Sequence, residues 1–143
     1  MVLHPVVIYS DQGAYGVERN RGIPFQWTAP SPTIDVHNFS RTTVNGVDLT
    51  FSLAAPDAAP RRFTVQLPNG STRVVDVNGG AARQVQLVVN AVPGRNAVTI
   101  TTQSDAVLIG EADRKSVFGK LIDLRASVTD PKIRLGVVQQ RVE

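Results

Sequence analysis

The sequence contains no cysteine, so no disulfide can hold the fold together and no thiol chemistry is available. It has no apolar run that approaches the about 18 residues of a membrane-spanning helix. The N-terminal stretch lacks the basic segment and the apolar segment of a secretory signal. The domain must therefore be stabilised by its own hydrophobic core, which a chain of 143 residues is long enough to form.

The length fits a single domain, and no change of composition marks a boundary within residues 1–143. The chain opens directly into an apolar strand, so we expect it to be a fragment of a longer protein. The lack of cysteine does not define the compartment. An extracytoplasmic location is favoured if the parent is a membrane protein or an exported protein.

Lysine is scarce, because only Lys115, Lys120 and Lys132 contribute to the 15 basic residues, and the net charge is +3. The arginines are scattered singly along the chain, apart from Arg61 and Arg62. Nucleic-acid-binding proteins usually gather their basic residues in a run or on one face. We therefore expect no nucleic-acid partner.

Catalytic signatures are also missing, since the chain has no G-x-S-x-G, H-E-x-x-H, P-loop or G-x-G-x-x-G motif. Asp35 and His37 are two residues apart, a spacing that metal ligands use, but they lack a third ligand. A solvated strand face explains this pair better than a metal site does. We expect no enzyme activity, no metal and no cofactor.

Carboxylates that an enzyme could pair across a cleft include Glu18, Glu111 and Asp113, with Asp105 nearby in sequence. Sequence spacing alone cannot bring them together. Solvated loop charges are the simpler interpretation of the group near the C-terminal third.

Period-two alternation of apolar and polar residues dominates the sequence. The apolar sets are Ile34 and Val36; Val47, Leu49, Phe51 and Leu53; Phe63, Val65 and Leu67; Val85, Leu87 and Val89; Val98 and Ile100; and Ile133, Leu135 and Val137. Alternation of this kind predicts strands with one buried face, as in antiparallel sheets. About nine or ten such strands predict an all-β, antiparallel two-sheet β-sandwich of the jelly-roll or galactose-binding-like type.

Turn residues separate these strands. Asn45-Gly46, Asn69-Gly70 and Asn78-Gly79 are pairs that accept the positive φ of tight turns. Residues 61–77 read as the clearest hairpin, and Pro93-Gly94 marks another strand–turn–strand unit. The Pro/Ala-rich segment 52–62 is long enough to cross between sheets. Only the segment 110–121, GEADRKSVFGKL, could form a turn or two of helix.

The stretch YSDQGAYGVERNRGIPFQWTAP concentrates aromatic and charged residues. Carbohydrate-binding sandwiches hold the apolar faces of sugars on aromatic rings and bind the hydroxyls with charged side chains. The candidate ligand-binding residues are therefore Tyr15, Glu18, Arg19 and Trp27. Trp27 lies two residues from Phe25 and so shares its face, which also fits a core position, and we predict Trp27 as core. Glu18 is expected to lie in a solvent-facing loop, where it could pair with Arg114 or Arg125.

The segment GAYGVERNRGIPFQWT resembles the opening motif of a jelly-roll, carbohydrate-binding-like module that is appended to bacterial glycosyltransferases and polysaccharide-related membrane proteins. The matching positions are Gly13, Tyr15, Glu18, Gly22, Phe25 and Trp27, while Gln26 stands where that pattern has arginine. The segments VPGRNAVTI and DRKSVFGKLIDLRAS are similar to later parts of the same modules. The resemblance spans Gly13 to about Ser127 and implies a carbohydrate-linked setting.

The leading expectation is a non-catalytic, carbohydrate-binding-like accessory module in bacterial cell-envelope polysaccharide biology, with a glycan as its partner. The alternative is a structural or protein-interaction module whose partner is a parent or neighbouring envelope protein. A small β-sandwich hydrolase or lyase is a third reading. An exposed aromatic groove would favour the first, an apolar patch the second, and converging carboxylates the third.

Overall fold

The structure, a computed structural model, describes residues 6–10, 13–57, 59–78, 80–103, 107–109, 115–129, 133 and 135–138. This part of the chain contains strands and no helix, hence no helix of the length and apolar character needed to cross a membrane. The strands are β1 (Val6–Tyr9), β2 (Glu18–Asn20), β3 (Ile23–Thr28), β4 (Thr33–Asn38), β5 (Val44–Ala54), β6 (Arg61–Gln66), β7 (Thr72–Val77), β8 (Arg83–Ala91), β9 (Gly94–Thr102), β10 (Val107–Ile109), β11 (Lys115–Val117), β12 (Gly119–Val128) and β13 (Leu135–Val138).

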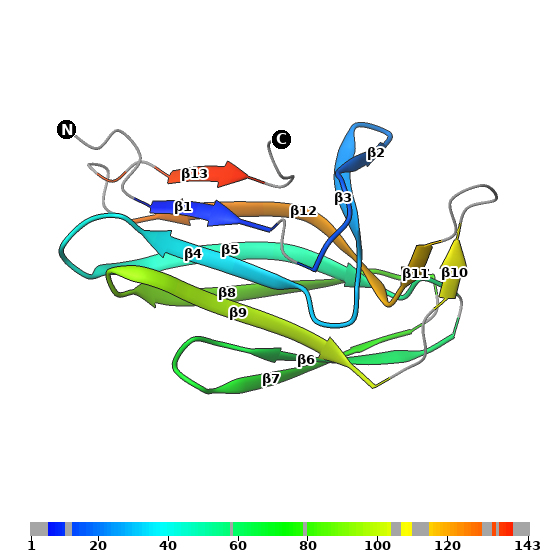
Figure 1. The fold of residues 1–143 in the computed structure, drawn as a ribbon. Helices are drawn as coiled ribbons and strands as arrows, with labels where there is room; N and C mark the ends of the chain where they lie inside the picture. The colour runs from blue at the N-terminus through cyan, green and yellow to red at the C-terminus, as the bar shows by residue number, and fades with distance from the viewer. Residues whose placement is uncertain are drawn as a thin grey trace.

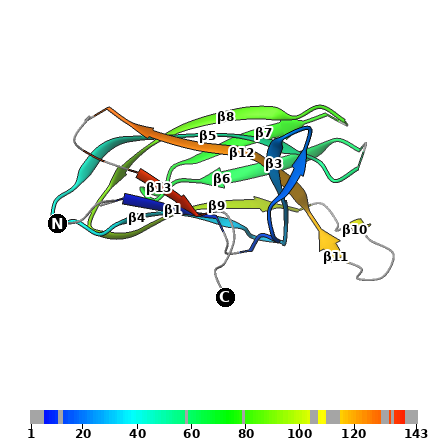
Figure 2. The ribbon, with the colours of Figure 1, turned by 90° about the horizontal axis from the view of Figure 1, so that it is seen from above.

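Two sheets pack face to face (Figure 1). Sheet A has the strand order β13-β1-β4-β9-β6-β7, and sheet B has the order β2-β3-β12-β5-β8. Figure 2 shows β8, β5 and β12 on one side of the molecule and β9, β4 and β1 on the other. A separate short hairpin is made by β10 and β11.

The connectivity is that of a jelly roll. β3 to β9 together with β12 are eight strands, which can be counted in the order of the chain. The first, eighth, third and sixth of them form one sheet in that order, and the second, seventh, fourth and fifth form the other. Two interlocked Greek keys produce this order. The predicted antiparallel two-sheet β-sandwich of the jelly-roll type is therefore confirmed.

Alternate residues of the long strands form one core between the sheets. Val47, Leu49, Phe51 and Leu53 of β5 are each at most 1% exposed. Phe63 of β6 is buried while Thr64 beside it lies on the opposite, half-buried face. Full burial of such side chains contributes about 1.5–3 kcal/mol each, so the alternation is the main source of stability.

The two ends of the described chain also lie in the sandwich. β1 pairs with β4 on one side and with β13 on the other, and the β1–β13 pairing is parallel. Val137 was predicted to face inward but is 42% exposed. The reason is that β13 is the outermost strand of sheet A, so its side chains have a neighbouring strand on one side alone.

The predicted turn at Asn69-Gly70 is confirmed, while Gly79 of the predicted Asn78-Gly79 turn lies outside the described residues. β6 and β7 form the predicted hairpin, with Gly70 at φ +89°. Asn45-Gly46 instead lies inside β5, where the register with β8 shifts between Val44 and Val47. The pair therefore forms a bulge, because one extra residue with positive φ can be absorbed within a strand.

Two connections cross between the sheets. β8 belongs to sheet B and β9 to sheet A, so the turn at Pro93-Gly94 joins the layers without pairing the strands. The Pro/Ala-rich segment between β5 and β6 crosses as predicted. The segment 110–121, which could have formed a turn or two of helix, is strand at Lys115–Val117 and from Gly119 onward, and 110–114 lie outside the described residues.

β2 and β3 form the edge of sheet B, so Glu18, which was expected in a loop, lies in a strand. β2 and β3 form a hairpin that projects from the sandwich (Figure 1). Its two-residue turn consists of Arg21 at φ +52° and Gly22 at φ +81°. Positive φ at both positions is the type I′ geometry that matches the twist of paired strands.

Candidate functional site

Phe25 and Trp27 lie on the outer face of sheet B. Both rings are half-buried, and they meet edge to face with centroids 5.8 Å apart. The intervening Gln26 and the following Thr28 are the buried residues of β3, at 1% and 3% exposure. The prediction of Trp27 as a core residue is therefore wrong: the two rings share a face, but that face is the solvent side.

Gln26 faces inward because its polar atoms find partners there. Its Oε1 accepts a hydrogen bond from Ser10 Oγ (2.7 Å), and its Nε2 donates to the carbonyl oxygens of Ser10 and Tyr15 (3.1 Å each). Burying an amide is tolerated when it is hydrogen-bonded. Gln26 thus fastens the segment before β2 to β3 and turns the aromatic residues outward.

Lys120 of β12 covers the aromatic pair. It is the cross-strand neighbour of Trp27, and its Nζ lies 4.6 Å from the Trp27 ring centroid and 4.9 Å from that of Phe25. Ammonium groups at this distance are attracted by the ring quadrupole. The side chain consequently holds both rings in place on the sheet surface.

The other predicted ligand residues fall around this pair. Tyr15 is half-buried, and its N–H donates to the Trp27 carbonyl oxygen (2.9 Å), which puts it next to Trp27 in the sheet. Glu18 is exposed and is the cross-strand partner of Phe25, so the two lie on the same side.

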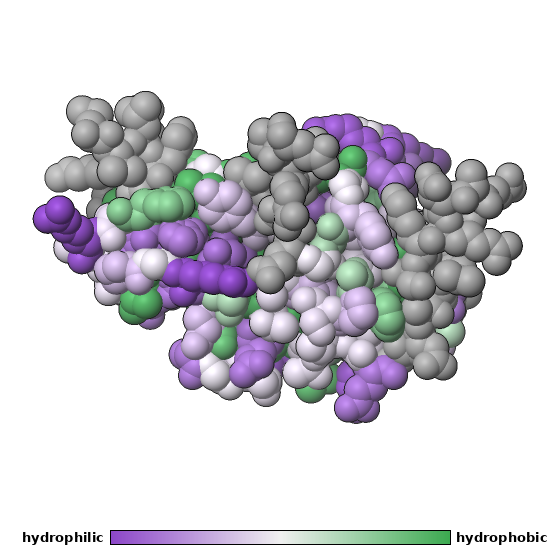
Figure 3. Space-filling view, in the orientation of Figure 1, coloured by the Kyte–Doolittle hydropathy of each residue, from purple (hydrophilic) through white to green (hydrophobic). Residues whose placement is uncertain are grey.

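Arg19 is the next residue of β2 and so faces the opposite side from Glu18. Its Nη1 donates to the Gly22 carbonyl oxygen (3.2 Å), within the hairpin. Figure 3 shows a hydrophilic surface over the tip of the hairpin. The structure therefore brings Tyr15, Glu18 and Trp27 together and separates Arg19 from them.

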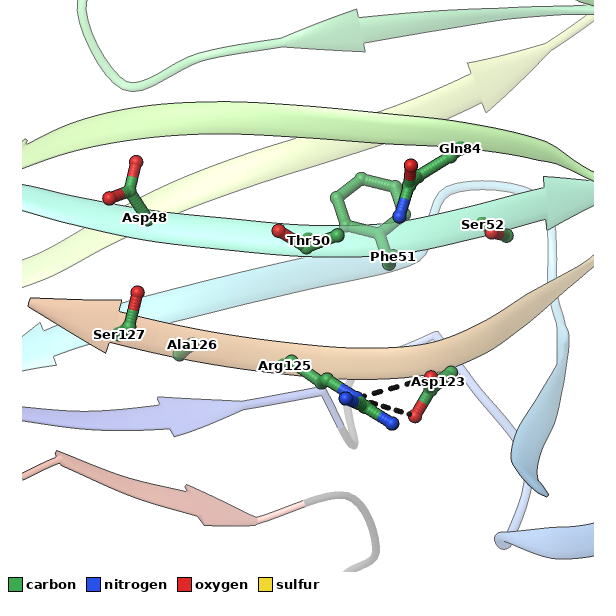
Figure 4. A pocket seen from close by; sticks show the side chains of 9 residues that line it. All are labelled: Asp48, Thr50, Phe51, Ser52, Gln84, Asp123, Arg125, Ala126 and Ser127. Carbon is green, nitrogen blue, oxygen red and sulfur yellow. Dashed lines mark hydrogen bonds and ion pairs between the residues drawn. The ribbon is translucent and has the colours of Figure 1, made fainter. Parts of the chain in front are cut away.

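A trough on the same outer face runs along β5 between β8 and β12 (Figure 4). It has a volume of about 480 Å³ and is lined by Asp48, Thr50, Phe51, Ser52, Gln84, Asp123, Arg125, Ala126 and Ser127. Short polar side chains at alternate positions of β5 form its floor, which is why the surface is hollow there. The longer side chains of Gln84 and Arg125 rise from the neighbouring strands.

The wall on β12 contains a strained residue. Asp123 has φ +53°, and the register of β12 with β5 shifts between Ile122 and Arg125. The bulge places Arg125 Nε 3.2 Å from the Asp123 carboxylate. Left-handed conformations of residues other than glycine cost of order 1 kcal/mol and collect at functional sites, so this wall is a candidate binding element.

One row of cross-strand partners connects the trough to the aromatic pair. It runs from Gln84 on β8 through Ser52 and Ile122 to Phe25 and then Glu18 on β2. Neighbouring strands are about 4.8 Å apart, so the row crosses sheet B in steps of that length. The trough and the rings therefore form one continuous surface.

The pair Asp35 and His37 lies on sheet A, on the opposite side of the sandwich. His37 Nδ1 is 3.5 Å and Arg95 Nε 3.7 Å from Asp35 Oδ2, and the His37 ring stacks on Phe39 with centroids 4.2 Å apart. Within the described ranges, no three His, Asp or Glu side chains come together as metal ligands do.

Several nominated carboxylates lie elsewhere. Asp105, Glu111 and Asp113, like His4, are outside the described residues. The suggested pairing of Glu18 with Arg125 is wrong, because Arg125 pairs with Asp123, and Arg114 is also outside the described residues. Sequence reasoning did not select the trough residues, although the polar phase of β5, Asp48, Thr50 and Ser52, was a visible signal.

Comparisons with known proteins relate the chain to solved structures alone. No protein-family model and no curated protein matches the sequence. The CBM35 of Cellvibrio japonicus Abf62 is similar in structure at 15% identity and a TM-score of 0.42, covering 85% of this chain and 96% of that one. A family 35 carbohydrate binding module from Clostridium thermocellum gives 18% identity and a TM-score of 0.41, covering 81% and 96%.

Enzymes with bound sugars also match. An exo-β-1,3-galactanase from Phanerochaete chrysosporium with β-1,3-galactotriose gives 14% identity and a TM-score of 0.40. The match covers 85% of this chain and 30% of the galactanase, so the chain spans less than a third of that enzyme. These are examples of the structures that this jelly roll is similar to, and the assignment of its own fold rests on the strand order given above.

Proposed function

We propose that this domain binds a carbohydrate chain, without catalysis, on the outer face of sheet B. The observation that carries the proposal is the union on one surface of a polar trough and an outward-facing aromatic pair. A pyranose has an apolar C–H face that packs on aromatic rings and a rim of hydroxyls that require hydrogen-bond partners. Ligand sites generally combine apolar contact area with a few placed polar groups in a concavity.

The proposed contacts have distinct roles. Trp27 and Phe25 support a sugar ring once the flexible Lys120 side chain moves off them, with Tyr15 and Glu18 beside them. Gln84, Asp48 and Arg125 exchange hydrogen bonds with hydroxyls in the trough. Each such bond contributes about 1 kcal/mol net, because water is displaced from both partners. About four to eight contacts of this strength, ring contacts included, correspond to dissociation constants of about 1 mM to 1 µM.

The two alternative functions, a protein-interaction module and a hydrolase or lyase, have less support. In the described part of the chain, the exposed large apolar residues are spread over both sheets: Ile23, Phe39, Val74, Val88, Val92 and Val137. Scattered apolar residues are normal for a soluble surface and do not make a docking patch. Asp76 has its pKa lowered by a hydrogen bond from Arg62, but this ion pair is solvent-exposed on β6 and β7, away from the trough, and so does not support acid–base catalysis.

The cell-envelope setting is a finer proposal. It rests on the resemblance of GAYGVERNRGIPFQWT to modules attached to polysaccharide-related bacterial proteins. In this proposal the domain holds a parent protein near its polysaccharide.

The proposal is tested by titrating oligosaccharides while following tryptophan fluorescence. Trp27 is the single tryptophan, so its emission reports the proposed site directly. We expect saturable changes at micromolar to millimolar sugar. In this assay Gln84→Ala should weaken binding, whereas Arg62→Ala, on sheet A, should not. Trp27→Ala removes the fluorescent reporter, so its weaker binding is measured by calorimetry. Absence of binding by a broad glycan panel at millimolar concentration would overturn the proposal.

A further inference from the structure

Asp48 differs from the other aspartates that the structure describes. The carboxylates of Asp35, Asp57, Asp76 and Asp123 each accept a hydrogen bond or form an ion pair. Asp48 is half-buried on the trough floor and has no such partner within the described ranges. Figure 4 shows its carboxylate standing free on β5, at the end of the trough opposite Ser52.

Among the residues that the structure describes, the basic side chains of this face do not neutralise Asp48. Arg125 is engaged by Asp123, and Lys120 lies over the aromatic rings. Lys120 is opposite Ala54, six residues along β5 from Asp48, which corresponds to roughly 20 Å of extended strand. The trough lining carries two carboxylates and one guanidinium, so its formal charge is −1.

An ionised carboxylate accepts hydrogen bonds and donates none. The ligand must therefore supply donors to Asp48. Hydroxyl and ammonium groups do so, while a ligand carboxylate offers no donor and is repelled. Like charges about 4 Å apart repel by about 1 kcal/mol even in bulk water, and by more at a partly buried site.

We propose that Asp48 makes the trough selective for neutral and amino sugars over acidic sugars. The inference rests on the proposed carbohydrate-binding function and names its substrate class. In this proposal the oligosaccharide lies along β5, over the trough floor from Asp48 to Ser52. That part of the strand is about 13 Å long. The sugar unit above Asp48 binds through hydroxyl or ammonium donors.

The whole-chain charge leads to the opposite expectation. With a net charge of +3, non-specific attraction favours acidic polysaccharides. A preference for neutral or amino sugars would therefore have to come from the local site. Measurements near physiological ionic strength keep the distant charges screened, because the Debye length there is about 8 Å.

The experiment compares three oligosaccharide series of equal length, composed of glucose, glucosamine and galacturonate units, by calorimetry and Trp27 fluorescence. We expect the glucosamine series to bind at least as tightly as the glucose series, and galacturonate to bind about fivefold more weakly or worse. Asp48→Asn keeps the shape of the side chain and should bring the ratio of the glucose affinity to the galacturonate affinity close to one. Asp76→Asn makes the same change of charge on sheet A and should leave the discrimination unchanged.

Outcomes separate the two proposals. Binding of none of the series would overturn the carbohydrate function itself. Binding with an equal or greater affinity for galacturonate, or equal discrimination in Asp48→Asn, would overturn the role of Asp48 and leave the function standing. If Asp48→Asn folds poorly, the test is made on the wild-type protein by measuring the ratio of its affinities for glucose and galacturonate oligosaccharides at increasing salt. The proposal requires this ratio to fall as salt is raised, and a constant ratio overturns it.

Discussion

Gly119→Ala tests the contact that joins the two sheets below the aromatic pair. Gly119 begins β12 in sheet B, and Phe63 reaches it from β6 in sheet A. A Cβ atom at Gly119 would lie 2.8 Å from Phe63 Cζ and 2.9 Å from Cε1, with the Ala54 carbonyl oxygen at 3.3 Å. Carbon atoms prefer separations of about 3.5–4.0 Å, so the ring or the strand would have to move by about 0.7 Å or more.

Neither partner can move freely. The Phe63 ring is 2% exposed and is surrounded by the core, while the Ala54 carbonyl oxygen of the β5 backbone also lies close to the new methyl group. Overpacking of this kind costs about 1–3 kcal/mol. For a domain of this size the loss corresponds to a melting temperature lower by about 3–10 °C.

Urea unfolding measures the effect, with the expectation of a lower midpoint and an unchanged slope. Gly16→Ala is the matched control, since no atom lies within 4 Å of its added Cβ, and should change stability by less than about 0.5 kcal/mol. Phe63→Leu, which removes the clashing atoms, should cost less in the Gly119→Ala background than alone, because the two sites share one space. Equal stabilities for the Gly119→Ala and Gly16→Ala variants would refute the packing argument.

Two further predictions concern the surface. Arg21→Asn creates the Asn-Gly pair that type I′ turns prefer and should stabilise the protein by up to about 1 kcal/mol in urea unfolding; a loss of stability would mean that the Arg21 side chain holds the hairpin. The pKa of Asp76 is lowered, first by its hydrogen bond from Arg62, so the pair contributes a small stabilisation above the ordinary aspartate range near pH 4, and that contribution is lost as the pH falls through the lowered pKa. The free energy of unfolding of Asp76→Asn should therefore be lower than that of the wild-type protein at neutral pH and should approach it in acid. A difference in stability that grows in acid would contradict the assignment.

The aromatic segment illustrates why the candidate site was only partly predictable. Alternation correctly put Phe25 and Trp27 on one face of a strand. It could not say which face is inward, since FQWT offers two aromatic residues on one side and two small or polar residues on the other. The choice depends on Ser10, sixteen residues away, whose hydroxyl and carbonyl satisfy the buried amide of Gln26. Partners at that separation become visible when the chain is folded.

The trough was also only partly predictable from the sequence. The polar phase of β5 was evident in VDLTFSL, but a polar strand face is ordinary for an antiparallel sheet. The hollow arises because β8 and β12 flank β5 with longer side chains and because Asp123 adopts a left-handed conformation at a bulge. Strand order and register, which come from the long-range pairing, decide which side chains stand beside one another.

The sequence by itself determined the class of fold. Apolar residues stand at every second position of β4 to β9, so each strand has one face to bury. Turn residues divide the chain into these strands, and burying their apolar faces against one another gives a two-sheet sandwich. The tertiary structure decided the rest: that Asn45-Gly46 is a bulge within β5, that β8 and β9 lie in different sheets, and that Trp27 faces solvent. Each of these depends on hydrogen bonds and contacts between segments far apart in the chain, and such pairings leave no periodic trace in the residues themselves.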